Sequence, residues 1–529
     1  MSGALHRLGA VVRADVLIRL RRLSTAVLFV LLSAIPYMWI PEPSTGRTLI
    51  QIEGQRALYN SAAIGMATAL LGALFIGLFG FYVVSNALRK DVVTRCGTVI
   101  ASTTMRAGEY LVGKFAGNAA FLTLFTLGYM AVAMAMVVVR GEASLEPWVF
   151  AKQYLILLPP TIVFVSAIAL VFECTPLLRT KLGDVGYFFL WLGLMGAAAS
   201  MLDAQSSRWA ASLDVSGTGF VMQQLQEVTG IQGLAIGSSQ FDAAKPPFVF
   251  DGLSLGVEWL GPRLLATVWP LLLLFVARLF FHRFDPARVR VAAERTRRSW
   301  AGRANALAKP FARLVVRVGE GIASLPLLPR FVRASITDAT ATLAAFPLVV
   351  VGIIGFAIAA INVDEKSLFT GLLPLAFAAC AIAIADVASR EKRFGTMALT
   401  FAAPSLRGRF VIWKFASTLL VAFAFLGVPL VRAIALRPES AVKLLVAVAF
   451  VSAAATSLGI VTANPKAFIV LFLTFWYVTT NDQGANPSFD YAGFFGTATP
   501  AVTTAYAIAA FVAIAAASLV HGAQLRRRW

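Results

Sequence analysis

Residues 153–173 read QYLILLPPTIVFVSAIALVFE, with no charged side chain before Glu173. A helix needs roughly 20 apolar residues to cross the hydrocarbon core of a bilayer, so this stretch predicts a membrane span. Similar runs recur along the chain, which is 59% hydrophobic and 14% charged, with a mean hydropathy of +0.78. Soluble proteins carry about 25% charged residues. The composition therefore predicts an all-α membrane protein and excludes collagen-like, disordered and disulfide-scaffold classes.

The same length criterion predicts twelve transmembrane helices, six in each half of the chain. Their approximate ranges are 24–40, 61–85, 115–139, 153–173, 185–201 and 264–281, then 340–362, 368–385, 412–434, 441–462, 467–480 and 501–520. An even number of spans places both termini on the same side of the membrane.

The distribution of lysine and arginine predicts which side this is. If the N-terminus is cytoplasmic, the inner segments hold 35 of the 46 basic residues, as the positive-inside rule requires. The net charge of +20 is then mainly a topology signal, and it would attract anionic lipid headgroups on the inner face. No nucleic-acid partner is needed to explain it. We expect a multi-pass protein of a bacterial inner (cytoplasmic) membrane with both termini in the cytoplasm.

The segment 1–23 predicts an amphipathic helix on the inner interface rather than a cleaved signal peptide. Apolar residues recur there at helical spacing, whereas the arginines fall off that line. The apolar line consists of Leu5, Leu8, Val12, Val16, Leu20 and Leu23. A flexible basic tail is the alternative interpretation.

Two parts of the chain repeat the same features in the same order. The sequence RCGT at 95–98 is followed by Lys114, and RFGT at 393–396 is followed at a similar spacing by Lys414. The predicted fourth and tenth spans share the sequence FVSA, at 164–167 and 450–453. Each half also opens with an amphipathic segment. These matches predict two pseudo-symmetric six-helix halves with the same orientation in the membrane.

This division predicts three parts. Residues 1–281 form the first half, with a long outer loop at 202–263; residues 282–339 form a basic cytoplasmic linker; residues 340–529 form the second half. The linker either contacts the lipid surface or is a solvated disordered run. The outer loop either covers an exit path or meets a partner, or is an inert insertion.

The chemistry of an autonomous pump or enzyme is not evident in the sequence. The predicted spans are nearly free of charged residues, which disfavours ion coupling. Residues 108–115 approximate a phosphate-binding loop, but Phe115 occupies the place of the hydroxyl residue that would bind magnesium. The three cysteines are too scattered for a metal site. The chain is therefore predicted to be non-catalytic, with no cofactor or metal of its own.

The sequence SREKRFGTMALTFAAPSLRGRFVIWK at 389–414 resembles the inner loop of type-2 ABC transporter permeases. In that family the loop holds an acidic and basic pair, then Gly-Thr, an apolar stretch, a Pro-Ser/basic turn and a lysine that opens the third span. The matching residues here are Glu391, Lys392, Gly395, Thr396, Pro404, Ser405, Arg407 and Lys414. The first half matches more loosely, through Arg95, Gly97, Thr98, Arg106, Gly113 and Lys114.

The resemblance implies that this loop forms a coupling helix on a separate cytosolic ABC ATPase, present as two copies or a heterodimer, which binds ATP and magnesium. It implies ATPase contact at Arg95, Gly97, Thr98, Arg106, Lys114, Glu391, Arg393, Gly395, Thr396, Arg407 and Lys414. Two departures suggest that the two loops are unequal. Asp91 lies six residues before Gly97, whereas Glu391 lies four before Gly395, and Trp413 replaces the glycine that precedes the lysine.

The sequence thus predicts the permease subunit of an ABC exporter for an apolar or amphiphilic cargo. The alternative is a twelve-span secondary carrier of the major-facilitator type, which also has two parallel six-span halves and a long middle loop. Against the alternative stand the amphipathic inner loops, where that class has a short Gly/Arg-rich turn, and the lack of carboxylates inside the spans.

Overall fold

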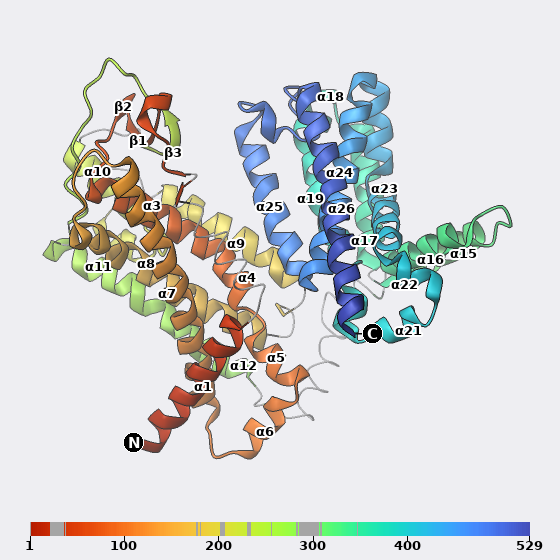
Figure 1. Ribbon diagram of the computed structural model, residues 1–529, viewed down its shortest axis with the longest axis horizontal. Helices are drawn as coiled ribbons and strands as arrows, with labels where there is room; N and C mark the ends of the chain where they lie inside the picture. Colours follow the sequence, from red (N-terminus) through yellow and green to blue (C-terminus); the bar gives the residue numbers. More distant parts are fainter. Residues whose placement is uncertain are drawn as a thin grey trace. The chain divides into compact units, whose positions relative to one another are not determined.

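The computed structural model describes most of the chain as two compact units, Met1–Ala292 and Ala293–Trp529 (Figure 1). The described residues are 2–21, 36–37, 39–175, 178–179, 181–200, 207–229, 234–254, 256–281, 284, 306, 309–345 and 347–528. The boundary between the units falls inside the predicted linker, 282–339.

Among the described residues, eight helices are long and apolar enough to cross a membrane, or nine if one bent pair counts as a single span. They are Ser61–Val92, Ala107–Arg140, Pro147–Cys174, Val257–Phe280, Glu365–Ile384, Phe410–Leu436, Pro438–Thr462 and Pro500–Arg526. These helices confirm the helical, multi-pass character that the composition predicted. Eight of the predicted spans therefore have a counterpart of full length.

The other four predicted spans have different outcomes, so the count of twelve stays a prediction. The span at 24–40 lies mainly outside the described residues. The span at 185–201 corresponds to the shorter apolar helix Gly183–Ala198, and 467–480 corresponds to α25 (Pro465–Asp482), which is not among the eight.

The predicted span at 340–362 corresponds to the bent pair of helices, which is the ninth candidate span if the two helices are taken together. Its first residues belong to α16 (Arg330–Ala345), and the chain then turns by 94° into α17 (Pro347–Asn362). Proline disfavours helical geometry in the residue before it, and its own fixed φ suits the first turn of a new helix. Pro347 is the first residue of α17, which is a position that proline favours.

Unit 1 is a helical bundle with a small sheet at one end (Figure 1). Its central helices are α3, α7 and α8, and α3 continues through a π-helical turn, η2, into α4. The helices are α1 (Ser2–Leu20), α3 (Ser61–Phe75), η2 (Ile76–Gly80), α4 (Phe81–Val84), α5 (Ala87–Val93), α6 (Cys96–Ser102), α7 (Ala107–Arg140), α8 (Pro147–Cys174), α9 (Lys181–Ser200), α10 (Thr218–Thr229), α11 (Val257–Val268) and α12 (Leu272–Phe280), with 3-10 turns η1 (Pro43–Thr45), η3 (Arg208–Ser212) and η4 (Trp269–Leu271).

The core of unit 1 contains closely packed aromatic rings. Phe81 stacks on Tyr187 with ring centroids 3.6 Å apart, and Phe172 meets Phe81 edge to face. A Cβ at Gly77 would collide with the Trp191 ring, so only glycine allows α9 to approach η2 this closely. The bundle around η2 therefore has the tight packing of a protein interior.

A three-stranded antiparallel sheet lies beside the bundle, in the order β2-β1-β3, and was not predicted. Its strands are β1 (Arg47–Ile52), β2 (Gln55–Arg56) and β3 (Leu234–Gln240). β3 comes from the predicted outer loop 202–263 and pairs with β1 along most of its length. The described part of that loop is thus packed onto its own unit.

Unit 2 is a second helical bundle, preceded by a hairpin of α15 and α16 (Figure 1). Its remaining helices include three short ones, α20 to α22, between α19 and α23. The elements are α15 (Lys309–Ala323), α16 (Arg330–Ala345), α17 (Pro347–Asn362), α18 (Glu365–Ser367), η5 (Leu368–Leu372), α19 (Leu373–Ile384), α20 (Arg390–Phe394), α21 (Met397–Phe401), α22 (Pro404–Gly408), α23 (Phe410–Leu436), η6 (Pro438–Ser440), α24 (Ala441–Thr462), α25 (Pro465–Asp482), η7 (Pro487–Phe489) and α26 (Pro500–Arg528).

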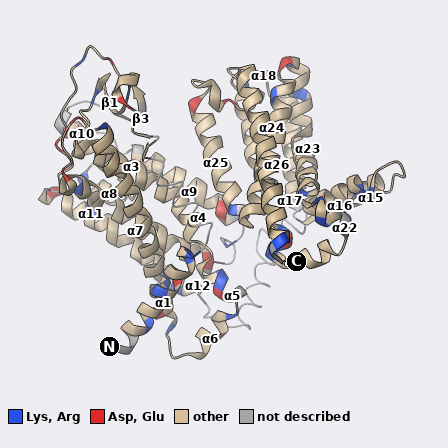
Figure 2. Cartoon of the chain, viewed as in Figure 1, with Lys and Arg blue, Asp and Glu red and all other residues tan. Residues whose placement is uncertain are grey.

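Charged residues are concentrated near the ends of the long helices of unit 2, and the middle sections of α23, α24 and α26 are almost entirely uncharged (Figure 2). A helix with an uncharged middle section can face lipid without exposing a charge to hydrocarbon. The charged groups therefore belong to the helix ends and the segments that connect them.

Candidate functional site

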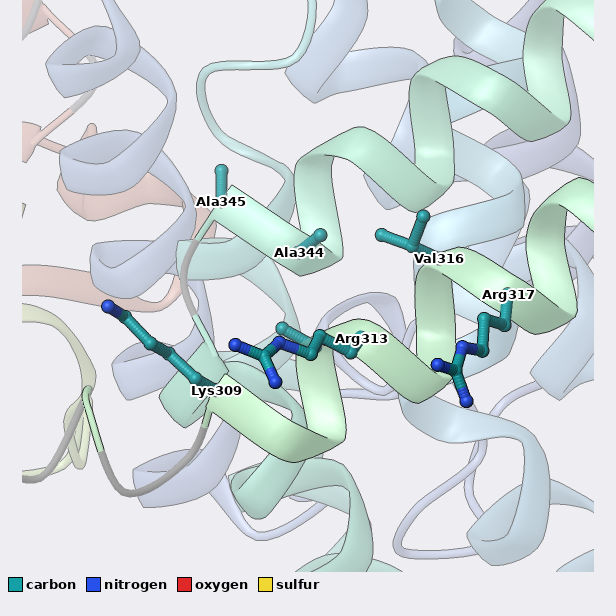
Figure 3. Close-up of a pocket in the computed structure, with 7 residues that line it drawn as sticks. Lys309, Arg313, Val316, Arg317, Ala344 and Ala345 are labelled. Carbon is teal, nitrogen blue, oxygen red and sulfur yellow. The ribbon is translucent and has the colours of Figure 1, made fainter.

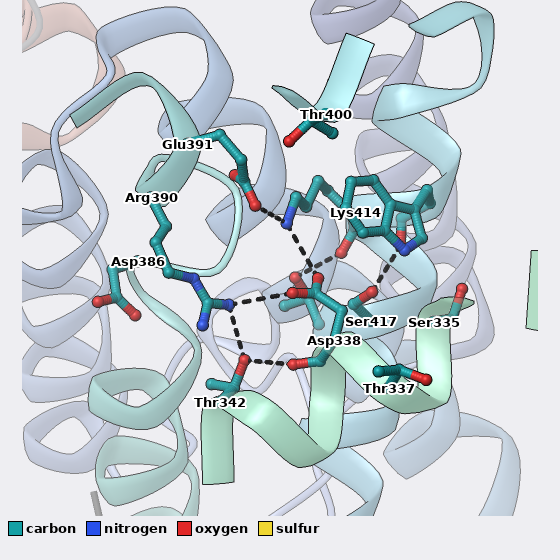
Figure 4. Close-up of polar contacts among 12 residues, drawn as sticks. Ser335, Thr337, Asp338, Thr342, Asp386, Arg390, Glu391, Thr400, Lys414 and Ser417 are labelled. Atoms are coloured by element: carbon teal, nitrogen blue, oxygen red, sulfur yellow. Dashed lines mark hydrogen bonds and ion pairs between the residues drawn. The ribbon is translucent and has the colours of Figure 1, made fainter. Parts of the chain in front are cut away.

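The repeated lysine of unit 2 lies at the centre of a buried ion cluster (Figure 4). Lys414, in the first turn of α23, is fully buried, and its Nζ lies 3.0 Å from Asp338 Oδ2 on α16. The same Nζ pairs with the Glu391 carboxylate on α20. One ammonium group thus joins a membrane helix, the segment that leads into the unit and the predicted coupling loop.

A second cation completes this cluster. Arg390 Nη2 lies 3.4 Å from Asp338 Oδ1 and donates to Thr342 Oγ1 at 2.7 Å. Asp338 therefore accepts from both Lys414 and Arg390, and buried charges are tolerated when they are paired in this way. The cluster links α20 to α16 as well as α23.

Unit 1 builds a corresponding cluster around Lys114, which is 5% exposed. Its Nζ lies 3.0 Å from Asp15 on α1 and 2.9 Å from Asp91 on α5. Tyr110 donates a hydrogen bond to Asp91 Oδ2 at 2.5 Å. Arg19 pairs with Asp15 at 2.7 Å, so this cluster also contains a second cation. In each unit, one lysine therefore holds three elements together. They are a long helix (α7 or α23), a loop segment (α5 or α20) and an earlier helix, here called the lead-in helix (α1 or α16).

The helix α1 lies against α7 along two glycines. A Cβ at Gly113 would be 2.9 Å from Val11 Cγ1, and one at Gly117 would be 3.2 Å from Asp15 Cβ. Residues 108–115, which approximate a phosphate-binding loop, are part of the continuous helix α7 and form no loop. The buried face of α1 also differs from the predicted apolar line, because Asp15 and Arg19 are buried whereas Leu5 is exposed. Their ion pairs make that burial possible.

Two loops precede the long helices α7 and α23. They are residues 85–106 (loop A) and 385–409 (loop B), and they differ in which residues adopt a left-handed backbone conformation. In loop B the left-handed position is Gly395, with φ +71°, at the end of α20. Loop A has two left-handed positions, Asn86 with φ +85° directly before α5 and Arg95 with φ +59° directly before α6. Gly97 lies inside α6, where a Cβ would meet the Phe284 ring at 2.7 Å. The two matching glycines therefore serve different steric needs.

Both loops expose large apolar side chains beside basic ones. Val99 on α6 is 66% exposed, as is Phe394 at the end of α20, and Leu399 on α21 is 78% exposed. Arg95 lies near the first of these in the sequence, and Arg393 directly precedes the second. An exposed apolar centre with a basic rim is the surface that protein partners commonly cover.

The predicted contact residues separate into two groups by burial. Arg95, Thr98, Arg106, Gly395 and Thr396 are exposed, and Arg393 and Arg407 are half-buried. Gly97, Lys114, Glu391 and Lys414 are buried. The second group is enclosed within its own unit, so in this structure it holds the loops in place, and its predicted contact with a partner stays a prediction.

Sequence reasoning missed three members of the clusters, namely Asp15, Asp338 and Arg390, and it noted Asp91 only as the acidic residue of the first loop. One signal was available. Asp15 is the single acidic residue in α1, and Asp338 is the single acidic residue in α16. A lone carboxylate in an otherwise basic and apolar helix, at corresponding places in two halves, indicates a specific ionic partner.

The two loops are also fixed differently to the helices packed against them. In loop A, the Glu173 carboxylate at the end of α8 accepts from four successive backbone N–H groups, those of residues 86 to 89, at 2.7 to 3.3 Å. At the corresponding place in α24 stands Gly459, where a Cβ would lie 3.1 Å from Ala388 Cβ. Loop A is thus capped by a charge, and loop B is packed directly against a helix.

We expect Glu173→Gln to loosen loop A, because an amide offers one acceptor oxygen and no charge to four donors. The cost is about 1–2 kcal/mol in the free energy of unfolding, since hydrogen bonds to charged groups contribute more than neutral ones. Faster hydrogen exchange of the α5 amides would measure this. Glu439→Gln, at an exposed carboxylate, is the control, and equal exchange in both variants would contradict the capping role.

Within the described residues, no group of three or more His, Cys, Asp or Glu side chains is placed to hold a metal ion. The two sites join each loop to a long apolar helix through ion pairs, and the loops expose apolar side chains beside basic ones. Comparisons of the chain with known protein families, with curated proteins and with solved structures found no match.

Proposed function

We propose that the chain is the membrane-spanning subunit of an ATP-binding cassette exporter. In this proposal the chain is two pseudo-symmetric halves of six spans, and separate cytosolic ATPase subunits bind ATP and magnesium. The observation that carries the proposal is the pair of buried lysine clusters. Each one connects an exposed loop to the start of a long membrane helix.

The clusters supply a means of transmitting movement. Glu391 in loop B is tied through Lys414 to α23, and Asp338 ties the same lysine to α16. Because separating a buried ion pair costs several kcal/mol, a partner that displaces loop B would move α16 and α23 with it. In loop A, Asp91, Lys114 and Asp15 connect α5, α7 and α1 in the same manner.

The exposed parts of the loops supply the docking surface. Val99, Phe394 and Leu399 would enter apolar pockets of the ATPase, and the basic side chains beside them would meet acidic residues at the rim. The buried lysines would keep each loop attached to its helix while the ATPase is docked on the loop.

The apolar middle sections of the spans favour a lipid, hydrophobic peptide or other amphiphile as cargo over a small ion. The excess of basic residues on one side favours a bacterial inner membrane with both termini in the cytoplasm.

The test is co-purification of the full chain from its native membranes, followed by measurement of magnesium-dependent ATPase activity and of photolabelling by an ATP analogue on any second chain. Phe394→Asp and Leu399→Asp are expected to lower the recovered activity about tenfold, since burying an unpaired carboxylate in an interface costs more than about 1.4 kcal/mol. Arg393→Glu should reduce it further by reversing the charge at the rim.

The matched control is Leu327→Asp, because Leu327 is 95% exposed and lies in the turn between α15 and α16, outside loop B and outside the candidate spans. It should leave ATPase recovery unchanged. Full recovery from all three loop variants would contradict the proposal, as would ion-gradient-driven transport by the purified chain alone, which would instead favour a secondary carrier.

A further inference from the structure

The helix α15 carries three cationic side chains in one row that have no carboxylate partner in the described part of the chain. Lys309, Arg313 and Arg317 are spaced four residues apart, so they project from the same side of the helix. All three are exposed. No acidic side chain lies within ion-pair distance of any of them among the described residues, although lysines and arginines elsewhere in that part of the chain form ion pairs.

This row borders an open groove between α15 and α16, with a volume of about 490 Å³ (Figure 3). The cationic side chains come from α15, and Ala344 and Ala345 line the groove from the end of α16. The small alanines leave room beside the guanidinium groups. The groove therefore combines positive charge with a wall that is small and apolar.

A second side of α15 is apolar and exposed. Leu314, Val318 and Ile322 follow one another at four-residue intervals, next to the basic row. The third side packs against α16, where a Cβ at Gly319 would collide with the Thr340 side chain. The helix thus has one face held by protein, one apolar face that nothing covers among the described residues, and one basic face.

The turn between α16 and α17 sets the orientation of this hairpin. α16 meets α17 at 94°, so if α17 runs across the bilayer, α16 and the antiparallel α15 run along its surface. A helix in that orientation buries its apolar face at the headgroup boundary and keeps its basic face at the level of the phosphates. The geometry of α15 meets both conditions.

We propose that the groove between α15 and α16 is a binding site for the phosphate of an anionic membrane phospholipid. Arg313 and Arg317 would hold the phosphate oxygens, and Lys309 would add a third charge at the open end. The acyl chains would lie along Leu314 and Val318. The proposal requires only a membrane protein and does not depend on an ATPase partner.

A lipid fits better than the other anionic classes. Arginine presents donors in a planar fork that suits phosphate oxygens, and a nucleic acid would need no apolar row beside the phosphate contacts. An acidic protein segment would also pair with the cations, but a phospholipid supplies the anionic group and the apolar chains in one molecule. The combination of a phosphate-binding row and an adjacent apolar row corresponds to a phospholipid.

The test uses the purified full chain in detergent, with native mass spectrometry to titrate bound phosphatidylglycerol against phosphatidylcholine of the same acyl chains. Each cation near an anionic headgroup changes affinity about fivefold. The double variant Arg313→Gln/Arg317→Gln is therefore expected to weaken the first phosphatidylglycerol site about 25-fold. Phosphatidylcholine, whose phosphate charge is offset by its choline, should be weakened much less. Both positions are exposed, so folding should be retained and a thermal scan would verify it.

Two further single variants serve as comparisons for the affinity of phosphatidylglycerol. Glu320→Gln removes the single carboxylate of α15, which is exposed one turn from Arg317, and should tighten phosphatidylglycerol binding several-fold. Arg409→Gln removes an exposed arginine elsewhere in unit 2 and should have no effect. Equal weakening by Arg409→Gln and by the double variant would overturn the site.

A third arm separates lipid from soluble phosphate. Excess inorganic phosphate should fail to displace phosphatidylglycerol, because the apolar row contributes to lipid binding alone. Leu314→Asn/Val318→Asn should accordingly weaken both phospholipids by similar factors. Displacement by inorganic phosphate, together with no effect of the Leu314 and Val318 changes, would assign the groove to a soluble anion and overturn the proposal.

Discussion

Lys414→Met is expected to destabilise unit 2 strongly. Methionine has a similar length but no charge, so Asp338 would keep only Arg390, and buried Glu391 would lose the ion pair that it makes with Lys414. Removing one member of a buried ion pair costs about 3–5 kcal/mol, because the remaining charge is left uncompensated. The thermal unfolding midpoint of the purified chain should fall by several degrees.

A compensating variant distinguishes ion pairing from packing. Lys414→Met/Glu391→Met removes the closest pair together and leaves Asp338 with Arg390, so at least half of the lost stability should return. Lys366→Met, at an exposed lysine, should change the free energy of unfolding by no more than about 0.5 kcal/mol. If the double variant is no more stable than Lys414→Met, the ion pair is not the source of the effect.

The sequence was sufficient to predict the class of the protein and the position of most spans. Apolar runs long enough to cross a bilayer are local features, and eight of them appear as helices of full length. The break at Pro347 was also visible as a proline, but its consequence depends on where α16 packs. The strand β1 was missed because its partner, β3, is remote from it in the sequence and a short strand has little local signal.

The repeated lysines show the same limit at the candidate site. Their repetition marked Lys114 and Lys414 as special, but the sequence could not say what they contact. Their carboxylate partners Asp15 and Asp338 lie 99 and 76 residues away. A lysine that opens a span after a basic loop resembles a surface residue until the lead-in helix is placed against it. Burial, which decides between a partner contact and an internal link, is a property of that placement.

Gly113→Leu is expected to separate α1 from α7 in unit 1. A Cβ at this position already lies 2.9 Å from Val11, so a leucine side chain leaves no room for α1 where it now lies. Displacement would lengthen the contacts of Asp15 with Lys114 and of Arg19 with Asn118, now 3.0 and 2.6 Å. Overpacking costs about 1–3 kcal/mol, and the loosened ion pairs would add to it.

Limited trypsin digestion measures the separation directly, because α1 carries exposed Arg13 and buried Arg19. Cleavage after Arg19 should accelerate in Gly113→Leu at least tenfold, whereas Arg13 should change less. Gly108→Leu is the matched control on the same helix, since a Cβ there meets nothing within 4 Å. Unchanged cleavage after Arg19 in Gly113→Leu would mean that α1 is not held by this crossing. The lysine cluster would then stabilise α7 and loop A without fixing the lead-in helix.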